Sequence, residues 1–139
     1  MLSPGDIVLL DFPYTNRAGS KVRPGLVLGA GPHQQHGDVN VAYITSELDF
    51  YLYDPSAVSI TAGDMSQGTL KHDSVARVDK VLTIQSNKCR KVARLNSNKI
   101  DEVLRKATLL QVENFAANKY TLPTFIPGTK IESYLGVNF

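Results

Sequence analysis

The chain has 139 residues, of which 42% are hydrophobic, so it is long enough for one domain with a substantial apolar core. Its net charge of +2 excludes a strongly basic tail of the histone kind but is compatible with a nucleic-acid partner. A single cysteine, Cys89, excludes an internal disulfide, and no apolar stretch approaches the ~20 residues that span a bilayer. The first residues lack the pattern of a signal peptide. We therefore expect a soluble, cytoplasmic protein with no membrane partner.

The first two thirds of the chain predict short strands separated by turns. Apolar and β-branched runs predict strands at residues 7–12, 26–29, 40–45, 57–61, 75–84 and 92–95. The strand at 75–84 is expected to bend near Asp79 and Lys80. Turn-forming residues separate the strands at Gly31–Gly37, Tyr53–Ser56 and Gly63–Gly68. Short strands at this spacing favour a small antiparallel barrel or sandwich.

A helical pattern follows over Ser97–Tyr120. Apolar residues recur there at helical spacing and form one stripe, at Ile100, Val103, Leu104, Ala107, Leu110 or Gln111, and Phe115. Asn98, with Asp101 three residues later, is predicted to cap the start of the helix. The helix should lie on the barrel and cover an open end or edge. Residues 1–119 are thus predicted to be one domain, and residues 120–139 a non-helical C-terminal extension of unknown role.

A polar loop, Pro13–Val22, joins the first two predicted strands and is rich in cations. Arg17, Lys21 and Arg23 lie in or directly after it, beside Gly, Ser and Asn, which is a composition suited to binding phosphate. Pro24 restricts Arg23 to extended geometry and so sets the direction in which its side chain leaves the backbone. The sequence therefore predicts a phosphate-binding site around Arg23.

Two further groups could complete such a site. Thr45 and Ser46 place two hydroxyls at the end of the strand at 40–45. Arg77 and Asp79 are two residues apart on a strand, so they share one face, where they form either a surface ion pair or part of a pocket. Together with Arg23, these groups offer a guanidinium for charge, a carboxylate for proton transfer and a hydroxyl for orientation. Such a set suits phosphodiester chemistry without a metal.

Other chemistries find little support in the sequence. It has no phosphate-binding loop of the GxxxxGK[ST] kind, no GxGxxG and no GxSxG. His33, His36 and His72 are interpreted as exposed loop histidines rather than zinc ligands, because a closed zinc site needs about four ligands. Cys89, among basic residues, is either a plain surface or half-buried thiol or one with a lowered pKa. No cofactor and no metal are predicted.

The chain resembles toxins of the MazF/PemK family. The blocks that carry the resemblance lie at residues 5–16, 19–28, 42–46, 72–84 and 100–110, in the order and spacing of the family, and together span about Pro4–Gln111. The resemblance implies a mainly β fold with a C-terminal helix, a small antiparallel Src-homology-3-like barrel of the CcdB/PemK type that is usually a homodimer. It also implies metal-independent, sequence-specific cleavage of single-stranded RNA. In that reaction the 2′-hydroxyl attacks the adjacent phosphate and leaves a cyclic phosphate and a free 5′-hydroxyl.

The resemblance also implies partners and roles. A cognate antitoxin, MazE-like or of another type, would block the RNA groove, and operator DNA would be bound only through the antitoxin complex. Arg23 matches the arginine at the scissile phosphate, and Thr45 its hydrogen-bonding partner. Arg77 and Asp79 match an acid–base pair. We further expect RNA contacts from the side chains of Tyr14, Arg17, Ser20, Lys21 and Ser46.

One departure from the family pattern concerns the loop Pro13–Val22. Relatives often have a histidine or a glutamate there, and this chain has neither. Either Tyr14, Lys21 or Ser20 takes that place, or catalysis depends on the arginines alone, or activity is reduced. Two alternatives to a nuclease therefore stay open: a toxin of the same fold that binds DNA gyrase, and an inactive family member. The aromatic residues either stack on bases or belong to the core or a dimer contact: Tyr14, Phe50, Tyr51 and Tyr53.

Overall fold

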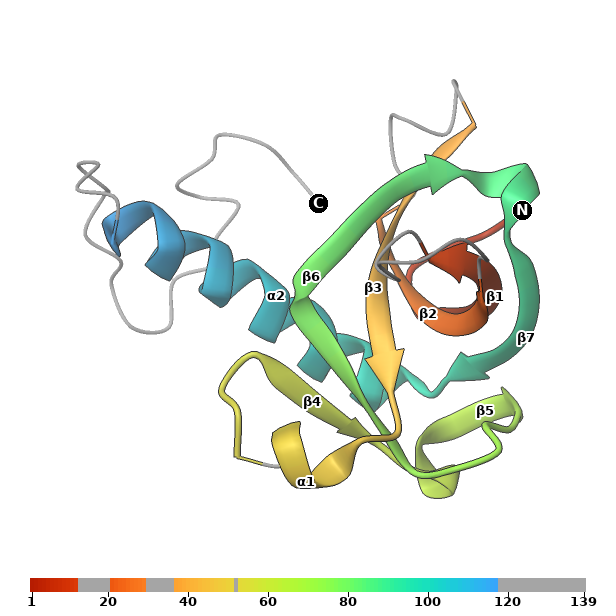
Figure 1. Cartoon of the computed structure of the whole chain (residues 1–139), viewed down its shortest axis with the longest axis horizontal. Coiled ribbons are helices and arrows are strands. Elements are labelled where there is room, and N and C mark those ends of the chain that lie inside the picture. Colours follow the sequence, from red (N-terminus) through yellow and green to blue (C-terminus); the bar gives the residue numbers. More distant parts are fainter. Residues whose placement is uncertain (13–20, 30–36, 52, 118–139) are drawn as a thin grey trace.

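The computed structural model describes residues 1–12, 21–29, 37–51 and 53–117. Most of the predicted turn Gly31–Gly37 and the whole extension at 120–139 lie outside the described residues. Within them, seven strands form one antiparallel sheet in the order β4-β6-β3-β2-β1-β7-β5. Figure 1 shows that this sheet is strongly curved, as a half-barrel, with the long helix α2 outside it. The predicted class, mainly β with a C-terminal helix, is confirmed.

The elements follow the predicted order along the chain. The strands are β1 (Asp6–Phe12), β2 (Lys21–Gly29), β3 (Asp38–Thr45), β4 (Ala57–Ile60), β5 (Met65–Gly68), β6 (Ser74–Gln85) and β7 (Arg90–Leu95). The helices are α1 (Leu48–Tyr51), α2 (Ser97–Ala117) and two short 3-10 turns, η2 (Ala62–Asp64) and η3 (Ser86–Lys88). Among these described elements, no helix is long and apolar enough to cross a membrane.

Three local predictions are corrected. β2 begins at Lys21 rather than residue 26, because it pairs with β1 as far as Phe12↔Lys21. Met65–Gly68 is a strand rather than a turn, since β7 offers it an edge to pair with. The cap of α2 is Asn96 rather than Asn98, because the backbone N–H of Lys99 donates to Asn96 Oδ1 at 2.9 Å.

The predicted bend in β6 is confirmed as a break in register against β3. Ala42 pairs with Val81, whereas its neighbour Tyr43 pairs with Arg77, so residues 78–80 lie between the two registers. An insertion of this kind bends and twists a strand. Figure 1 shows β6 turning along its length, from the side of β4 to the far end of β3.

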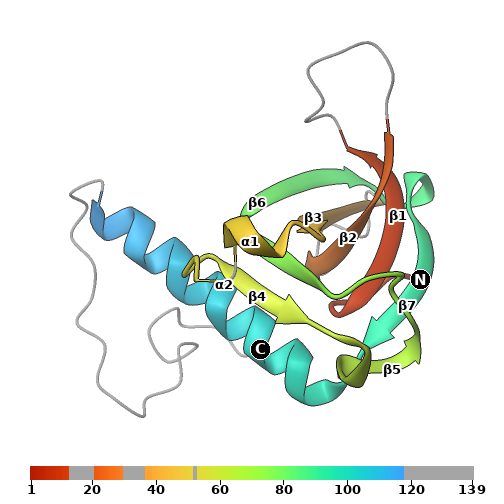
Figure 2. The ribbon, with the colours of Figure 1, turned by 60° about the horizontal axis from the view of Figure 1, so that its bottom comes forward.

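Alternation along the strands divides the apolar core into two clusters. Ile7 belongs to one cluster and Val8 to the other, because successive side chains of a strand point to opposite faces. The larger cluster lies under α2, whose Val103 is buried, with Ile100, Ala107 and Leu110 packed beside it. α2 lies along the edge strand β4 (Figure 2). The prediction that the helix covers an edge of the barrel is therefore confirmed.

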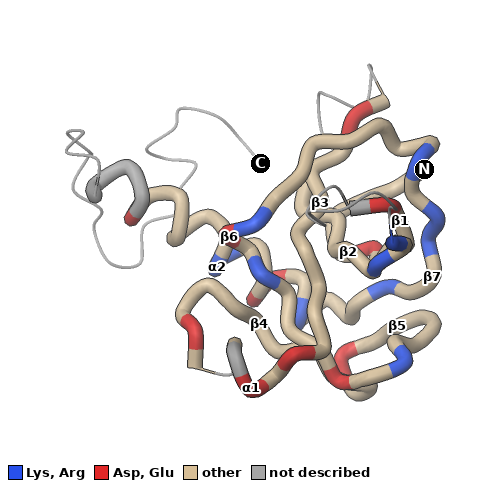
Figure 3. The backbone as a smooth tube through the Cα atoms, in the orientation of Figure 1, with Lys and Arg blue, Asp and Glu red and all other residues tan. Residues whose placement is uncertain are grey.

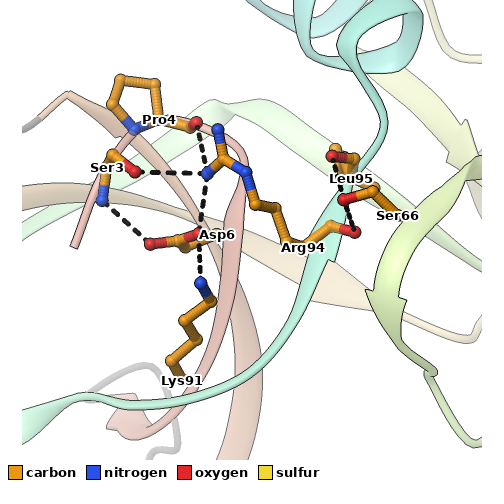
Figure 4. Close-up of polar contacts among 7 residues, drawn as sticks. All are labelled: Ser3, Pro4, Asp6, Ser66, Lys91, Arg94 and Leu95. Atoms are coloured by element: carbon orange, nitrogen blue, oxygen red, sulfur yellow. Dashed lines mark hydrogen bonds and ion pairs between the residues drawn. The ribbon is translucent and has the colours of Figure 1, made fainter. Parts of the chain in front are cut away.

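A buried carboxylate fastens β7 to β1. Asp6 has no exposed surface, and its Oδ1 accepts a hydrogen bond from Arg94 Nη1 at 2.8 Å and lies 3.3 Å from Lys91 Nζ (Figure 4). Its Oδ2 accepts the backbone N–H of Ser3 at 2.9 Å. Burial by itself would raise the pKa of Asp6. The hydrogen bonds from Ser3, Arg94 and Lys91 outweigh burial and lower that pKa, so the group is a carboxylate at neutral pH.

We predict that Asp6→Asn lowers the free energy of unfolding at pH 7 by about 2 to 4 kcal/mol, because the cations lose a buried partner. The lowered pKa of Asp6 stabilises the fold above the unfolded-state pKa and ceases to do so as pH falls through the folded-state value. Urea unfolding from pH 7 down to pH 2 should therefore show a smaller loss of stability with acid in the variant than in the native protein. The matched control is Asp101→Asn on the exposed side of α2. Equal acid dependence of native protein and Asp6→Asn would contradict the prediction.

Candidate active site

An open pocket of about 480 Å³ lies where β2 begins, β3 ends and the chain enters β6. The sheet order makes these three places neighbours, because β3 pairs with β2 on one side and with β6 on the other. The described residues that line the pocket are Leu9, Arg23, Pro24, Ile44, Thr45, Ser46, Glu47, Thr69, Leu70, Lys71, His72, Ser74 and Val92.

The pocket has an apolar floor and a polar mouth. Ile44 is buried and Leu9, Leu70 and Val92 are partly buried, whereas the charged side chains around them are mostly exposed. Apolar walls with a few polar groups at the opening are typical of ligand sites. A nucleotide could rest its base or sugar on the floor and its phosphate at the mouth.

Arg23 reaches the pocket through the pairing of β2 with β3. Gly25 pairs with Tyr43, and continuing that register brings Arg23 opposite Thr45. Arg23 is half-buried, and its guanidinium makes no hydrogen bond or ion pair with any residue that the structure describes. A guanidinium in this position can accept an anion without first breaking an ion pair with any of the described residues.

Thr45 closes the end of β3 and fixes the turn that follows. It is buried, and its Oγ1 accepts the backbone N–H of Glu47 at 3.2 Å. A hydroxyl that accepts a hydrogen bond can still donate its own proton, so Thr45 can serve a ligand oxygen as well. Ser46 is exposed at the mouth of the pocket. The two hydroxyls predicted at the end of this strand therefore both line the pocket, together with Arg23.

The predicted pair Arg77 and Asp79 is not among the pocket-lining residues. Arg77 Nη2 lies 2.6 Å from Asp79 Oδ2, and its Nη1 donates to Tyr51 Oη at 3.3 Å. The guanidinium also stacks over the Tyr51 ring, 4.7 Å from its centroid. Burial acts to lower the pKa of Arg77, but the contacts with Asp79 and Tyr51 outweigh it and raise that pKa above its usual range. Arg77 is therefore a positively charged group whose position is fixed by Asp79 and Tyr51.

This cluster of Arg77, Asp79 and Tyr51 nevertheless adjoins the pocket. Val75 is the register partner of Thr45, and Arg77 is two residues farther along β6, a separation of about 7 Å along the strand. The spacing of two residues also puts Val75 and Arg77 on the same face of β6. The structure thus places the four predicted catalytic residues on one region of the sheet but separates them into the pocket and a neighbouring ion pair.

The other predicted contacts have mixed outcomes. Lys21 is exposed at the start of β2 but does not line the pocket, and Tyr14, Arg17 and Ser20 lie outside the described residues. Tyr53 is 93% exposed.

Burial raises the pKa of Cys89, so the alternative of a lowered thiol pKa is wrong. Among the described residues, no three His, Cys, Asp or Glu side chains come together as a metal site would require.

Sequence reasoning missed three charged or titratable residues of the pocket: Glu47, Lys71 and His72. Glu47 follows the predicted Thr45–Ser46 pair directly, and the polar run before β6 carries Lys71 and His72. Neither segment has a pattern that links it to the other. Only the placement of β3 beside β6 brings them to one opening.

Charge is distributed unevenly around the pocket. Lys and Arg gather along β7 and at the start of β2, whereas acidic residues lie near α1 (Figure 3). The mouth of the pocket lies between these regions, with Arg23 on the side of β2 and Glu47 beside α1. A phosphate would be attracted to the β2 side, and a proton acceptor lies on the other.

A protein-family model matches most of the chain. The model of the PemK-like, MazF-like toxins of type II toxin–antitoxin systems matches residues 3–110. The chain belongs to this family. Comparison with curated protein sequences gives no match.

Solved structures of MazF toxins share the fold of this MazF/PemK-like toxin. A chain of the MazE–MazF complex from Deinococcus radiodurans is 25% identical, with a TM-score of 0.61, and the match covers 80% of this chain and 96% of that one. The Mycobacterium tuberculosis toxin MazF-mt6 is 22% identical, with a TM-score of 0.53, over 74% of this chain and 95% of that one. An endoribonuclease in complex with its cognate antitoxin, from a mycobacterial species, is 17% identical, with a TM-score of 0.57, over 79% and 97%.

The ion pair of this MazF/PemK-like toxin leads to a prediction about stability. Because Arg77 and Asp79 keep part of their side chains in solvent, Asp79→Asn should lower the free energy of unfolding by no more than about 1 kcal/mol. Glu102→Gln, which removes the exposed partner of Lys99 on α2, is the matched control and should have a similarly small effect in urea unfolding. A loss above about 2 kcal/mol for Asp79→Asn alone would identify the cluster as a structural element.

Proposed function

We propose that this toxin is a metal-independent endoribonuclease that cleaves single-stranded RNA, including mRNA, at specific sequences and so inhibits translation and growth. The observation that carries the proposal is the position of Arg23. Its guanidinium has no described partner, and the register of β2 against β3, continued by two residues, sets Arg23 opposite Thr45, which lines the same pocket. The name of the mycobacterial structural relative, an endoribonuclease, supports the same reaction class.

In the proposed reaction the 2′-hydroxyl of one nucleotide attacks the adjacent phosphorus, and the products are a 2′,3′-cyclic phosphate and a 5′-hydroxyl. Negative charge increases on the non-bridging oxygens as the fifth bond to phosphorus forms. Arg23 would stabilise that charge, and the Thr45 hydroxyl would donate to one of the same oxygens. Strand pairing already holds the backbones of both residues, which limits the reorganisation needed when the charge develops.

Arg77 and Asp79 are proposed to contact the RNA beside the scissile phosphate. Their acid–base role, which the family resemblance implies, stays a prediction, and the raised pKa of Arg77 argues against this residue as a proton donor. Ser46 and Lys21 would contact the RNA backbone at the mouth and on the β2 side. We propose the same role for three side chains of the first loop: Tyr14, Arg17 and Ser20.

The proposed partners are an antitoxin and a second copy of the toxin. The structural relatives include a MazE–MazF complex and an endoribonuclease with its cognate antitoxin. We propose that this toxin is likewise a homodimer neutralised by a MazE-like protein, and that the antitoxin blocks the approach of RNA to the pocket.

The test is cleavage of a long single-stranded RNA in EDTA, with primer extension to map the cuts and end analysis to identify the cyclic phosphate. Arg23→Ala should reduce the cleavage rate on the order of 10²–10³-fold, the effect of removing one donor that stabilises transition-state charge. Arg105→Ala, an exposed arginine on α2, is the matched control and should cleave at the native rate.

Two results would contradict the proposal. Native protein that fails to cut RNA in EDTA but inhibits supercoiling by DNA gyrase would favour the gyrase-binding alternative. Native protein with neither activity, and no growth arrest on expression, would indicate an inactive family member.

A further inference from the structure

Two titratable side chains at the mouth of the pocket have no role in the function proposed above. Glu47 follows β3 and His72 precedes β6, and both are exposed into the opening that Arg23 and Thr45 line. We propose that Glu47 and His72 are the proton-transfer pair of the cleavage reaction, with Glu47 as the base and His72 as the acid. This inference rests on the proposed function and assigns its proton transfers to Glu47 and His72 in place of Arg77 and Asp79, which do not line the pocket.

Local hydrogen bonds hold the backbone of both residues at the pocket. The N–H of Glu47 donates to Thr45 Oγ1 at 3.2 Å, which ties Glu47 to the buried end of β3. The Oγ of Ser74 donates to the carbonyl of His72 at 2.9 Å, which ties His72 to the buried start of β6. The backbones of Glu47 and His72 are therefore held just beyond the paired ends of two neighbouring strands, β3 and β6.

The reaction requires two proton transfers. Glu47 takes the proton of the 2′-hydroxyl as the O2′–P bond forms, and His72 as imidazolium gives a proton to O5′ as the P–O5′ bond breaks. The products are the cyclic phosphate and the 5′-hydroxyl. The two side chains return to their starting states when Glu47 releases one proton to water and His72 takes one proton from water. Imidazole suits this task because it ordinarily titrates near neutral pH.

The surrounding charges are consistent with these roles. Among the residues that the structure describes, Arg23 from β2 and Lys71 beside His72 are the other titratable residues that line the pocket, and β1 and β7 contribute Leu9 and Val92. Two cations near the phosphate would stabilise the anionic transition state. Asp79, by contrast, is held by Arg77 outside the pocket lining.

The test measures single-turnover cleavage against pH in EDTA. For the native protein we expect a bell-shaped profile, which rises as Glu47 ionises and falls as His72 loses its proton. His72→Asn should reduce the rate about 10²–10⁴-fold and remove the alkaline limb, and Glu47→Gln should reduce it similarly and remove the acid limb. Asp73→Asn and Asp49→Asn, exposed neighbours that do not line the pocket, are the matched controls and should keep the native rate and profile.

A second substrate tests whether His72 donates a proton to the leaving group or only supports the structure of the site. RNA with a bridging sulfur in place of O5′ has a thiolate leaving group, which departs without a proton. His72→Asn should therefore cleave this substrate within about tenfold of the native rate, while Glu47→Gln should stay slow on both substrates.

The outcomes distinguish this inference from the proposed function. If the native protein cuts RNA but His72→Asn is equally slow on both substrates, or keeps the alkaline limb of the pH profile, His72 is not the acid. If Glu47→Gln keeps the acid limb of the profile, Glu47 is not the base. Loss of the acid limb in Asp79→Asn would assign the base to Asp79. Native protein that does not cut RNA would overturn the proposed function and this inference together.

Discussion

The site depends on the pairing of β3 with β2 on one side and β6 on the other. The break in register against β6 decides which residues meet there. A continuous register from Ala42↔Val81 would set Val78 opposite Thr45, whereas the observed register sets Val75 there. The shift is by three residues, an odd number, so it exchanges the two faces of β6 and places Arg77 on the face of Thr45. The inserted residues at 78–80 are thus a condition for the arrangement of the site.

The fold and the pocket are coupled through β7. This strand supplies Val92 to the floor, yet it is held by the buried carboxylate of Asp6 and the cations Lys91 and Arg94 (Figure 4). A carboxylate that lost its partners in this position would be costly, so the interaction specifies where β7 lies against β1. Leu9 and Val92, from two strands that carry none of the proposed catalytic groups, can then form part of the apolar floor.

The sequence predicts those elements of this structure that depend on a pattern of neighbouring residues in the chain. Apolar and β-branched runs in β1 and β3 and the apolar stripe of α2 are sufficient to predict those elements, and the places of Arg23 and Thr45 at strand ends are sufficient to predict these two site residues. The start of β2 was missed because Lys21–Pro24 is polar, and becomes a strand only by pairing with β1. Glu47 and His72 are 25 residues apart in sequence and meet only because β3 lies beside β6. No local pattern could place them together.

The two arginines of the predicted site differ in what an incoming phosphate would have to displace. Arg77 already has a carboxylate and a phenol as partners, and its ring contact with Tyr51 fixes its plane. A phosphate that bound Arg77 would compete with Asp79 and would lie beside a second negative charge. Arg23 has no described partner to lose, and the nearest acidic group lining its pocket, Glu47, comes from the opposite strand end. In the proposed reaction, developing negative charge would therefore be stabilised at Arg23 at lower cost than at Arg77, which stays a cation already paired with Asp79 at the border of the pocket.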